Sequence, residues 1–342
     1  MKRIAFFWFF ALFLFLVSPC AYAQPDPWDE LYKAARAEGK VIWQLGTPVE
    51  EYKVVIDGFE KRFPGVKINP VRAVGASMVS RLITESASGN VSVDVAMLSL
   101  VFLKPLLDRD LLVKEDWKRF KNTDTSAALM DGRFLVVSGN AGVMIYNTKS
   151  VPPAKAPQKW EDLLNPEWKG QIAIPQTQIG FSILFEIWDE NKAVKYLETL
   201  AKQQLVVESG ANMTLPRCAN GEVALANTYM SQVPMWKAKG QPIDATPISP
   251  QWDSPQGVYS VKGLPHPNAA KLLMGWLITP EGQAAMVKTG RGLSSPCNAS
   301  APAQLFCDKG IKLIRTDTLE KALRQDNLIE RTRAILGLKP PT

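Results

Sequence analysis

Short apolar runs alternate with stretches whose apolar residues recur every three or four positions. In the segment 52–64, for example, Val55, Phe59 and Phe63 would share one face of a helix while the charged residues between them face water. Strands and helices alternating in this way are typical of an α/β fold with parallel strand pairing. The elements expected in this first unit are a strand at 41–46, a helix at 52–64, a strand at 66–74, a helix at 77–88 and a strand at 91–98.

The second half of the chain repeats the alternation, and two extended segments lie around it. These segments, 132–157 and 245–263, are rich in Val and Ile or in Pro and Gly, and we interpret them as crossover strands between two α/β units. Two such units predict a molecule of two lobes. The elements expected in the second unit are a strand at 169–175, one or two helices within 180–203, a strand at 205–209, and a helical turn and strand within 214–229.

The N-terminus has the features of a secretory signal peptide. Lys2 and Arg3 precede an apolar run at 4–17, and Ala21-Tyr22-Ala23 fits the small-x-small cleavage rule, which places the cut before Gln24. No later segment is apolar for long enough to cross a bilayer. We therefore expect residues 1–23 to be a signal peptide and the mature protein to be periplasmic.

Charge narrows the classes of partner. The formal net charge of +7 falls to +5 when Lys2 and Arg3 are removed, and basic residues are scattered without a run of four. A nucleic-acid surface is therefore not expected, whereas a mild positive charge weakly favours an anionic small molecule. Arg72 and Arg81 could hold a carboxylate or phosphate, or they could be ordinary solvated surface groups. No cofactor is expected.

Three cysteines remain after cleavage. Cys297 and Cys307 lie ten positions apart in a Pro- and Ser-rich loop, and export into an oxidising compartment predicts a disulfide between them. Closing so short a loop would contribute about 2–3 kcal/mol. Cys218 is then expected to be a buried free thiol. The spacing lacks the paired ligands that zinc needs, so no metal site is expected from the cysteines.

Four phrases in order carry a resemblance to a known family. They are PDPWDELYKAARAEGKV (25–41), AGVMIYNTKSV (141–151), WEDLLNPEWKGQIAIP (160–175) and GLPHPNAAKLLMGWLITPEGQ (263–283). Together they resemble the type II periplasmic substrate-binding proteins of ABC transporters, and within these the ferric-ion-binding and related solute-binding branch.

The resemblance implies an α/β, two-lobed periplasmic-binding-protein fold, each lobe a mostly parallel sheet flanked by helices and joined by crossover hinge strands. Lobe one would comprise 24–140 and 252–303, and lobe two 141–251 and 304–342, with the last helices packing on lobe two. Ligand would close the hinge, and the closed protein would dock on an inner-membrane ABC permease. A monomer without catalytic activity is expected.

Ligands of open α/β sheets bind beyond the carboxyl ends of strands, where helix N-termini direct N–H groups at negative charge. In the first half, Thr47 and Ser99 follow or end strands, and Ser77 lies at the start of a helix. We predict that all three bind ligand. The alternatives are an ordinary turn for Thr47 and a helix cap for Ser77.

The second half offers two more junctions. Gly180, Phe181 and Ser182 would supply the N–H groups of a helix start, and Asn212 would either bond ligand or cap its helix. Tyr229 ends the last strand of this half and would close over the ligand with its ring and hydroxyl. A core tyrosine is the alternative.

The nature of the ligand depends on the residue after Tyr229. Iron-binding members of the resembled branch typically use two adjacent tyrosines here, whereas this chain has Tyr229-Met230, and thioether sulfur is a poor ligand for a hard cation. The single histidine, His266, is expected to be a turn or cap residue. We therefore expect a small organic anion, namely a carboxylate, a phosphonate or a phosphorylated solute, with ferric iron bound through Tyr229 as the alternative.

Two other functions are considered. An exported hydrolase of the Ser-His-Asp type would need a histidine beside its nucleophile, but only His266 is present and no G-x-S-x-G elbow occurs. Paired-carboxylate hydrolysis stays open because acidic residues are widespread. A receptor for another transporter type or for a sensor kinase would keep the binding chemistry and change only the partner.

Overall fold

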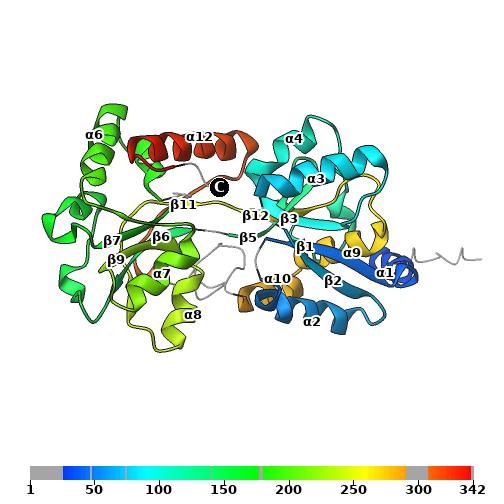
Figure 1. Ribbon diagram of the computed structural model, residues 1–342. Helices are drawn as coiled ribbons and strands as arrows, with labels where there is room; N and C mark the ends of the chain where they lie inside the picture. The colour runs from blue at the N-terminus through cyan, green and yellow to red at the C-terminus, as the bar shows by residue number, and fades with distance from the viewer. Residues whose placement is uncertain are drawn as a thin grey trace, which may run out of the picture.

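The computed structural model describes residues 26–46, 48–73, 75–139, 141–176, 180–289 and 307–339, and only the backbone of Gly75 and Ala76. Figure 1 shows two lobes side by side, each built on one β-sheet with helices against it. We call them lobe one and lobe two. The expected α/β class and the two-lobed architecture are confirmed.

Both sheets are mixed, so the expectation of mostly parallel sheets is wrong, and sheet one, in lobe one, contains parallel and antiparallel pairs. β1 pairs in parallel with β2 and β3, as the β-α-β pattern predicts, whereas β12 and β5 pair antiparallel because they are the crossover strands that connect to the other lobe. In order across the sheet the strands are β2 (Lys67–Arg72), β1 (Lys40–Leu45), β3 (Val95–Ser99), β12 (Gln256–Tyr259), β5 (Phe134–Ser138) and β4 (Ala128–Leu129).

Strand alternation gives sheet one two buried faces. On β3, Val95 and Met97 join one apolar cluster and Ala96 and Leu98 join another, as the period of two requires. The helices of the first cluster are α1 (Pro27–Glu38), α2 (Lys53–Arg62), α9 (Pro267–Leu277) and α10 (Pro280–Lys288). Those of the second are α3 (Gly75–Ser88), α4 (Lys104–Leu107) and the start of α12 (Leu319–Ile335).

Sheet two, in lobe two, is also mixed. β7 pairs in parallel with β8 and β9, while β6 pairs antiparallel with β9 and β10. Its strands in order are β10 (Ile243–Ala245), β6 (Gly142–Asn147), β9 (Leu225–Tyr229), β7 (Ile172–Pro175) and β8 (Val206–Glu208). The helices of this lobe are α5 (Leu184–Ile187), α6 (Glu190–Ala201), α7 (Ala211–Ala219) and α8 (Gln232–Ala238).

The two predicted crossovers are present. β5 leads from sheet one into β6 of sheet two, and β10 leads back through β11 (Gln251–Asp253) to β12. The crossovers touch each other through an antiparallel bridge between Ala141 and Asp253. The strands of each sheet fall within the ranges expected for its lobe, and the residue boundaries of the lobes stay a prediction.

The C-terminal segment differs from the expectation. β13 (Leu313–Arg315) pairs with β11, and α12 (Leu319–Ile335) contacts both lobes rather than lobe two alone. Figure 1 shows α12 running from beside α3 of lobe one across lobe two. Sequence periodicity fixes the helix but not what it packs against, because packing depends on contacts far apart along the chain.

Short 3-10 helices connect many of these elements. They are η1 (Val49–Tyr52), η2 (Leu100–Leu103), η3 (Trp117–Arg119), η4 (Thr125–Ala127), η5 (Pro153–Lys155), η6 (Trp160–Leu164), η7 (Pro166–Trp168) and η8 (Phe181–Ile183). Within the described part of the chain, every helix is too short or too polar to cross a bilayer.

The cysteine predictions have different outcomes. Cys218 is a buried free thiol, as predicted. Cys307 is disulfide-bonded, but Cys297 lies outside the described residues, so the pairing of these two cysteines stays a prediction. The signal peptide also lies outside the described residues.

Candidate functional site

The predicted ligand residues follow strands whose carboxyl ends align. In lobe one, Leu45 of β1 is opposite Arg72 of β2, so the two strands end together. In lobe two, Pro175 of β7 is opposite Glu208 of β8, and the parallel pairing of β7 with β9 brings Tyr229 to the same end. Each sheet therefore gathers its predicted residues at one edge, which is where ligands of open α/β sheets bind.

Tyr229 and Gly180 lie on the same face of sheet two. Asn227, two residues before Tyr229 on β9, shares its face because strand side chains alternate. A Cβ on Gly180 would lie 2.7 Å from Asn227 Nδ2, so a larger residue there would have to displace this buried amide. Tyr229 itself is half-buried. The structure thus brings together two predicted residues that are nearly fifty positions apart in sequence.

A buried glutamine that the sequence did not point to lies near Gly142, the residue paired with Tyr229 across sheet two. Gly142 of β6 is directly opposite Tyr229 and leaves room because it has no side chain. Gln251 Oε1 is 3.9 Å from the position of a Gly142 Cβ. Gln251 Nε2 donates to the Ile248 carbonyl (2.9 Å), which fixes the amide orientation, and Oε1 is buried without a hydrogen-bond partner. Only the fold reveals this residue, because it belongs to the other crossover.

Phe181 and Ser182 point into the core of lobe two. Both side chains are fully buried, and the Ser182 hydroxyl accepts a hydrogen bond from Trp252 Nε1 (2.9 Å). The helix expected to start here is only η8 followed by the four residues of α5, and α6 starts separately with Asp189 as its N-cap. The two buried side chains anchor the backbone that follows Gly180 in the core of lobe two. Their contact with ligand stays a prediction.

Asn212 lies in the first turn of α7 and is exposed. Gly210 is the N-cap of α7, so the capping role considered for Asn212 is wrong. The start of α7 is held against β9 by two hydroxyls: Thr214 Oγ1 donates to the Asn227 carbonyl (2.6 Å) and Thr228 Oγ1 to the Ala211 carbonyl (3.1 Å). Asn212 is therefore fixed near the carboxyl end of the sheet.

In lobe one, Ser77 is exposed within the first turn of α3. The capping role considered for it is wrong, because α3 already begins at Gly75. Ser99 ends β3, opposite Gln256 of β12, and immediately precedes η2. Thr47 lies outside the described residues.

A buried side chain ties these strand ends together. Gln44 of β1 is fully buried; its Oε1 accepts from the Met97 N–H (3.2 Å) and its Nε2 donates to the Ala73 carbonyl. It therefore joins β1 to the ends of β2 and β3, where Ser77 and Ser99 follow.

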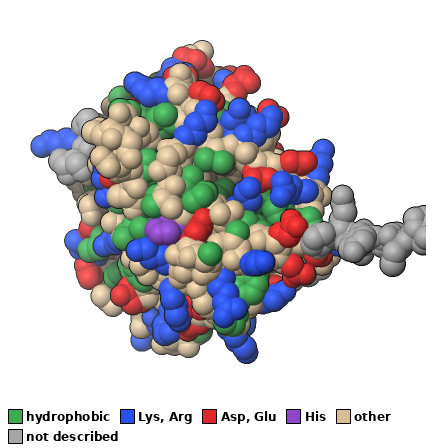
Figure 2. Space-filling view, turned by 90° about the vertical axis from the view of Figure 1, so that its right-hand side faces the viewer, with side chains coloured by type: hydrophobic (Ala, Val, Ile, Leu, Met, Phe, Trp, Pro, Cys, Tyr) green, Lys and Arg blue, Asp and Glu red, His purple; other side chains and the backbone are tan. Residues whose placement is uncertain are grey.

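His266 follows the predicted site residues in the sequence, and its side chain pairs with a buried carboxylate of lobe one. It occupies the N-cap position of α9, as predicted, and its Nδ1 lies 2.8 Å from Oδ2 of the buried Asp94. The Ile42 and His266 N–H groups also donate to this carboxylate. Figure 2 looks onto the end of lobe one, where the histidine reaches the surface among interspersed acidic and basic side chains.

The arrangement of possible metal ligands bears on the iron alternative. Among the described residues, no three His, Cys, Asp or Glu side chains gather closely enough to hold a metal ion. Met230 is 1% exposed and belongs to the apolar cluster under α7 and α8. Of the two arginines considered, Arg72 is exposed and Arg81 is 3.3 Å from Glu85, so Arg81 has a local carboxylate partner.

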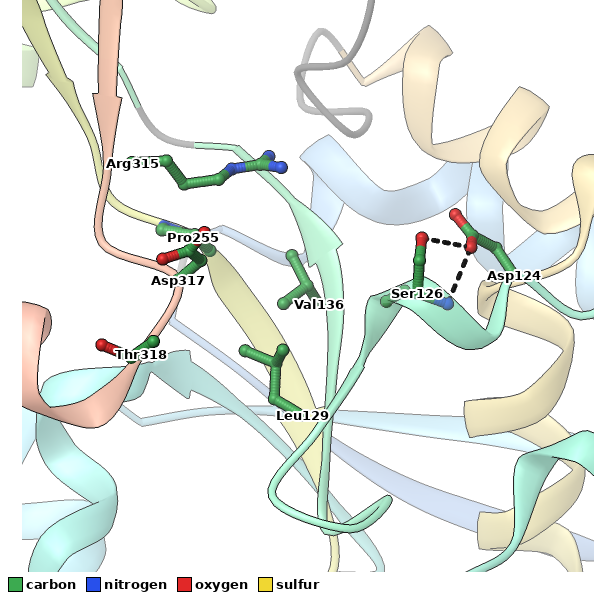
Figure 3. A pocket seen from close by; sticks show the side chains of 9 residues that line it. Asp124, Ser126, Leu129, Val136, Pro255, Arg315, Asp317 and Thr318 are labelled. Carbon is green, nitrogen blue, oxygen red and sulfur yellow. Dashed lines mark hydrogen bonds between the residues drawn. The ribbon is translucent and has the colours of Figure 1, made fainter.

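A separate cavity of about 400 Å³ lies between the edge of sheet one and the segment that leads from β13 into α12. Figure 3 shows Arg315 reaching over it from β13, with Asp124 and Ser126 on the opposite side from Asp317. Its lining contains none of the eight predicted ligand residues. The lining residues are Asp124, Ser126, Ala127, Leu129, Val136, Pro255, Arg315, Asp317 and Thr318.

A family model of bacterial extracellular solute-binding proteins matches residues 55–312, which is more than half of the chain. The chain belongs to this family. A relative from Haemophilus influenzae, described as an uncharacterized protein, is 26% identical over 172 residues, which are 48% of this chain and 50% of the relative. The solute-binding protein thus spans about half the length of the curated relative it matches.

Solved structures agree with the fold of the solute-binding protein. Iron-bound HitA from Pseudomonas aeruginosa has a TM-score of 0.69 at 16% identity, covering 86% of this chain and 99% of that one. The substrate-binding protein of an ABC transporter from Agrobacterium tumefaciens has a TM-score of 0.72 at 16% identity, covering 87% of this chain and 94% of that one. AfuA from Actinobacillus pleuropneumoniae, with fructose-6-phosphate bound, has a TM-score of 0.69 at 20% identity, covering 88% of this chain and 99% of that one.

Proposed function

We propose that this solute-binding protein is the periplasmic component of an ABC importer that captures a small organic anion and delivers it to an inner-membrane permease. The observation that carries the proposal is the convergence of strand ends in both lobes. In lobe one, β1 leads to η1, β2 to the start of α3, and β3 through Ser99 to η2. In lobe two, β7 leads to Gly180, β8 leads to α7, and β9 ends at Tyr229. Helix N-termini at such ends favour negative charge.

The chemistry of Tyr229 favours an organic ligand over ferric iron. A hard cation would need further oxygen ligands beside the phenol, and the next residue is a methionine buried in the core. A phenol beside helix N-termini instead offers an apolar ring and one hydrogen bond to a carboxylate, phosphonate or phosphate. The solved relatives include one with fructose-6-phosphate and one with iron, and both ligands belong in the test.

Hinge closure follows from the crossovers. Ligand that contacts residues of both lobes binds the closed arrangement better than the open one, so binding shifts the balance toward closed. The two crossover segments connect the lobes side by side at the Ala141–Asp253 bridge, where small backbone rotations would turn one lobe against the other. We propose lobe boundaries at 24–140 with 252–303, and 141–251 with 304–342.

The test is a thermal-shift screen of purified mature protein against carboxylates, phosphonates, sugar phosphates and ferric iron. An organic anion that raises the unfolding temperature and binds one per chain supports the proposal. A visible phenolate-to-iron absorption band, with no response to organic anions, would establish the iron alternative. Turnover of a bound compound would establish an enzyme.

The role of Tyr229 is tested with matched tyrosine variants. Tyr229→Phe should weaken binding of the identified anion about tenfold or more, because a hydrogen bond to a charged group contributes about 1.5–3 kcal/mol. Tyr32→Phe is the control: the Tyr32 hydroxyl donates to the Pro64 carbonyl (2.6 Å) in lobe one, so its loss should lower stability and leave affinity unchanged. Titration calorimetry measures both, and equal affinities for wild type and Tyr229→Phe would remove this hydroxyl from the site.

A further inference from the structure

The C-terminal helix α12 is fixed to lobe two. Leu328, Ile335 and Leu336 pack on the apolar cluster that contains Phe181. Two ion pairs support this contact: Arg324 Nε lies 2.5 Å from Glu186 Oε1, and Arg331 Nη2 lies 2.5 Å from Glu190 Oε1. Exposed ion pairs contribute little, so the apolar contacts mainly hold the helix on this lobe.

The end of α12 reaches the predicted ligand side of lobe two. Arg333 is almost fully buried, and its Nε donates to the Gln176 carbonyl (3.1 Å). Gln176 Nε2 in turn donates to the Lys339 carbonyl (2.9 Å), and its backbone N–H to the Glu208 carbonyl (2.6 Å). Gln176 directly follows β7 on the way to Gly180. Thus α12 and the residues after it hold one of the junctions at which ligand is expected.

The first turns of α12 contact lobe one. Ala322 is buried in the same apolar cluster as Leu100 and Leu103 of η2, the turn that follows Ser99. One turn later, Gln325 Oε1 accepts a hydrogen bond from Ser254 Oγ (2.9 Å) in the crossover between β11 and β12. The same helix therefore contacts a junction in lobe one, the crossover, and a junction in lobe two.

One polar group where the start of α12 meets lobe one and the crossover has no hydrogen-bond partner. Gln325 is 6% exposed, and its Nε2 is buried without a hydrogen-bond partner. A buried unpaired donor costs about 1–3 kcal/mol, and water would satisfy it if this surface opened. Fewer apolar side chains of α12 and the residues after it pack on lobe one than on lobe two, so the contact with lobe one is the one that lobe rotation would break.

We propose that α12 is a brace between the lobes, and that its contact with lobe one through Ala322 and Gln325 sets the balance between lobe arrangements. In the importer proposed above, on which the functional part of this inference rests, that balance sets the apparent affinity, because only the fraction of molecules in the binding-competent arrangement captures ligand. The conformational part does not depend on what the ligand is.

The test uses the ligand-free full mature chain, spin-labelled at one exposed position in each lobe through Lys61→Cys and Lys195→Cys. Pulsed electron–electron double resonance then measures the distribution of distances between the two spin labels, one in each lobe. Ala322→Trp should shift this distribution, because the added volume separates η2 from α12. Gln325→Leu should also shift it, because it removes both the unpaired donor and the acceptor of the Ser254 hydrogen bond. Ala334→Trp, the same change at an exposed position of the same helix, should leave it unchanged.

The outcomes are separable from those of the ligand screen. A distribution that is the same in wild type, Ala322→Trp and Gln325→Leu would overturn the brace, whatever the protein binds. If Ala322→Trp does not fold, Gln325→Leu alone decides, since it keeps the side-chain volume similar. If the lobes shift as expected but no organic anion binds, the brace stands and the proposed ligand class fails.

Discussion

At the scale of single residues, the predicted ligand edge is supported by buried polar side chains. Gln44 joins the strand ends of lobe one, and Asn227 underlies Gly180 in lobe two. Gln251 lies near Gly142, which is opposite Tyr229, and its Oε1 is buried and unpaired. Buried polar groups are costly unless they are paired, so their concentration at strand ends indicates that these ends are held in a defined geometry.

Cys218 should be chemically silent in the folded protein. Burial raises the pKa of this thiol to about 12, and its Sγ lies 3.6 Å from the Ala224 carbonyl. The reactive form is the thiolate, so iodoacetamide at pH 8 should not modify Cys218 until the protein is unfolded in guanidinium chloride. Peptide mapping by mass spectrometry checks this, and rapid labelling under native conditions would contradict the burial.

At the scale of elements, one carboxylate links three segments of lobe two. Asp244 of β10 lies 2.9 Å from Lys237 of α8 and 2.8 Å from Lys309, which precedes β13. Partial burial alone would raise the pKa of Asp244. Hydrogen bonds from Lys309, Lys237 and the Ala245 N–H outweigh that effect and lower the pKa below its ordinary value of 3.8.

The lowered pKa of Asp244 predicts a stability change with pH. Because the folded-state pKa lies below the unfolded one, the ionised group stabilises the fold above about pH 3.8 and loses this contribution as the pH falls through the folded-state value. Asp244→Asn should lower the free energy of unfolding by about 1–2 kcal/mol at pH 7. The difference from wild type should shrink below pH 3.8.

Denaturant unfolding at several pH values measures this difference. Asp57→Asn is the matched control, because Asp57 is exposed and pairs with Lys53 on the surface of α2 (2.7 Å). Its replacement should change stability by no more than about 0.5 kcal/mol. An Asp244→Asn effect as small as that of the control would show that the three-segment link contributes little.

At the scale of the whole molecule, the protein consists of two lobes, each with its own main sheet. Two crossovers and the helix α12 connect them. Each lobe has its own apolar clusters, and only a few segments cross between the lobes. Rotation of one lobe against the other would therefore disturb mainly these segments and the contact of α12 with lobe one, as the capture by closure proposed above requires.

A ligand that binds only the folded protein must raise its stability by mass action. At a ligand concentration one hundred times the dissociation constant, the free energy of unfolding should increase by about 2.7 kcal/mol. Chemical unfolding with and without the anion identified by the screen measures the increase. A ligand that binds by calorimetry but leaves unfolding unchanged would also have to bind the unfolded chain, and so would not be recognised by the fold.

The sequence by itself determined the α/β fold class, the division into two α/β units, the two crossovers and the family. Each of these depends on local periodicity or on short phrases of consecutive residues. It also led to Gly180 and Tyr229, because strand ends are visible in the pattern, and the structure places the two on one face of sheet two.

Only the tertiary structure decided which side chains point where. It turned Ser182 toward Trp252, placed Gln251 near Gly142 and brought α12 against both lobes. It also showed that Ser77 and Asn212 are not caps, because a helix can begin a residue or two before the best capping side chain. These outcomes depend on contacts between residues tens to hundreds of positions apart, and local sequence pattern carries no record of such contacts.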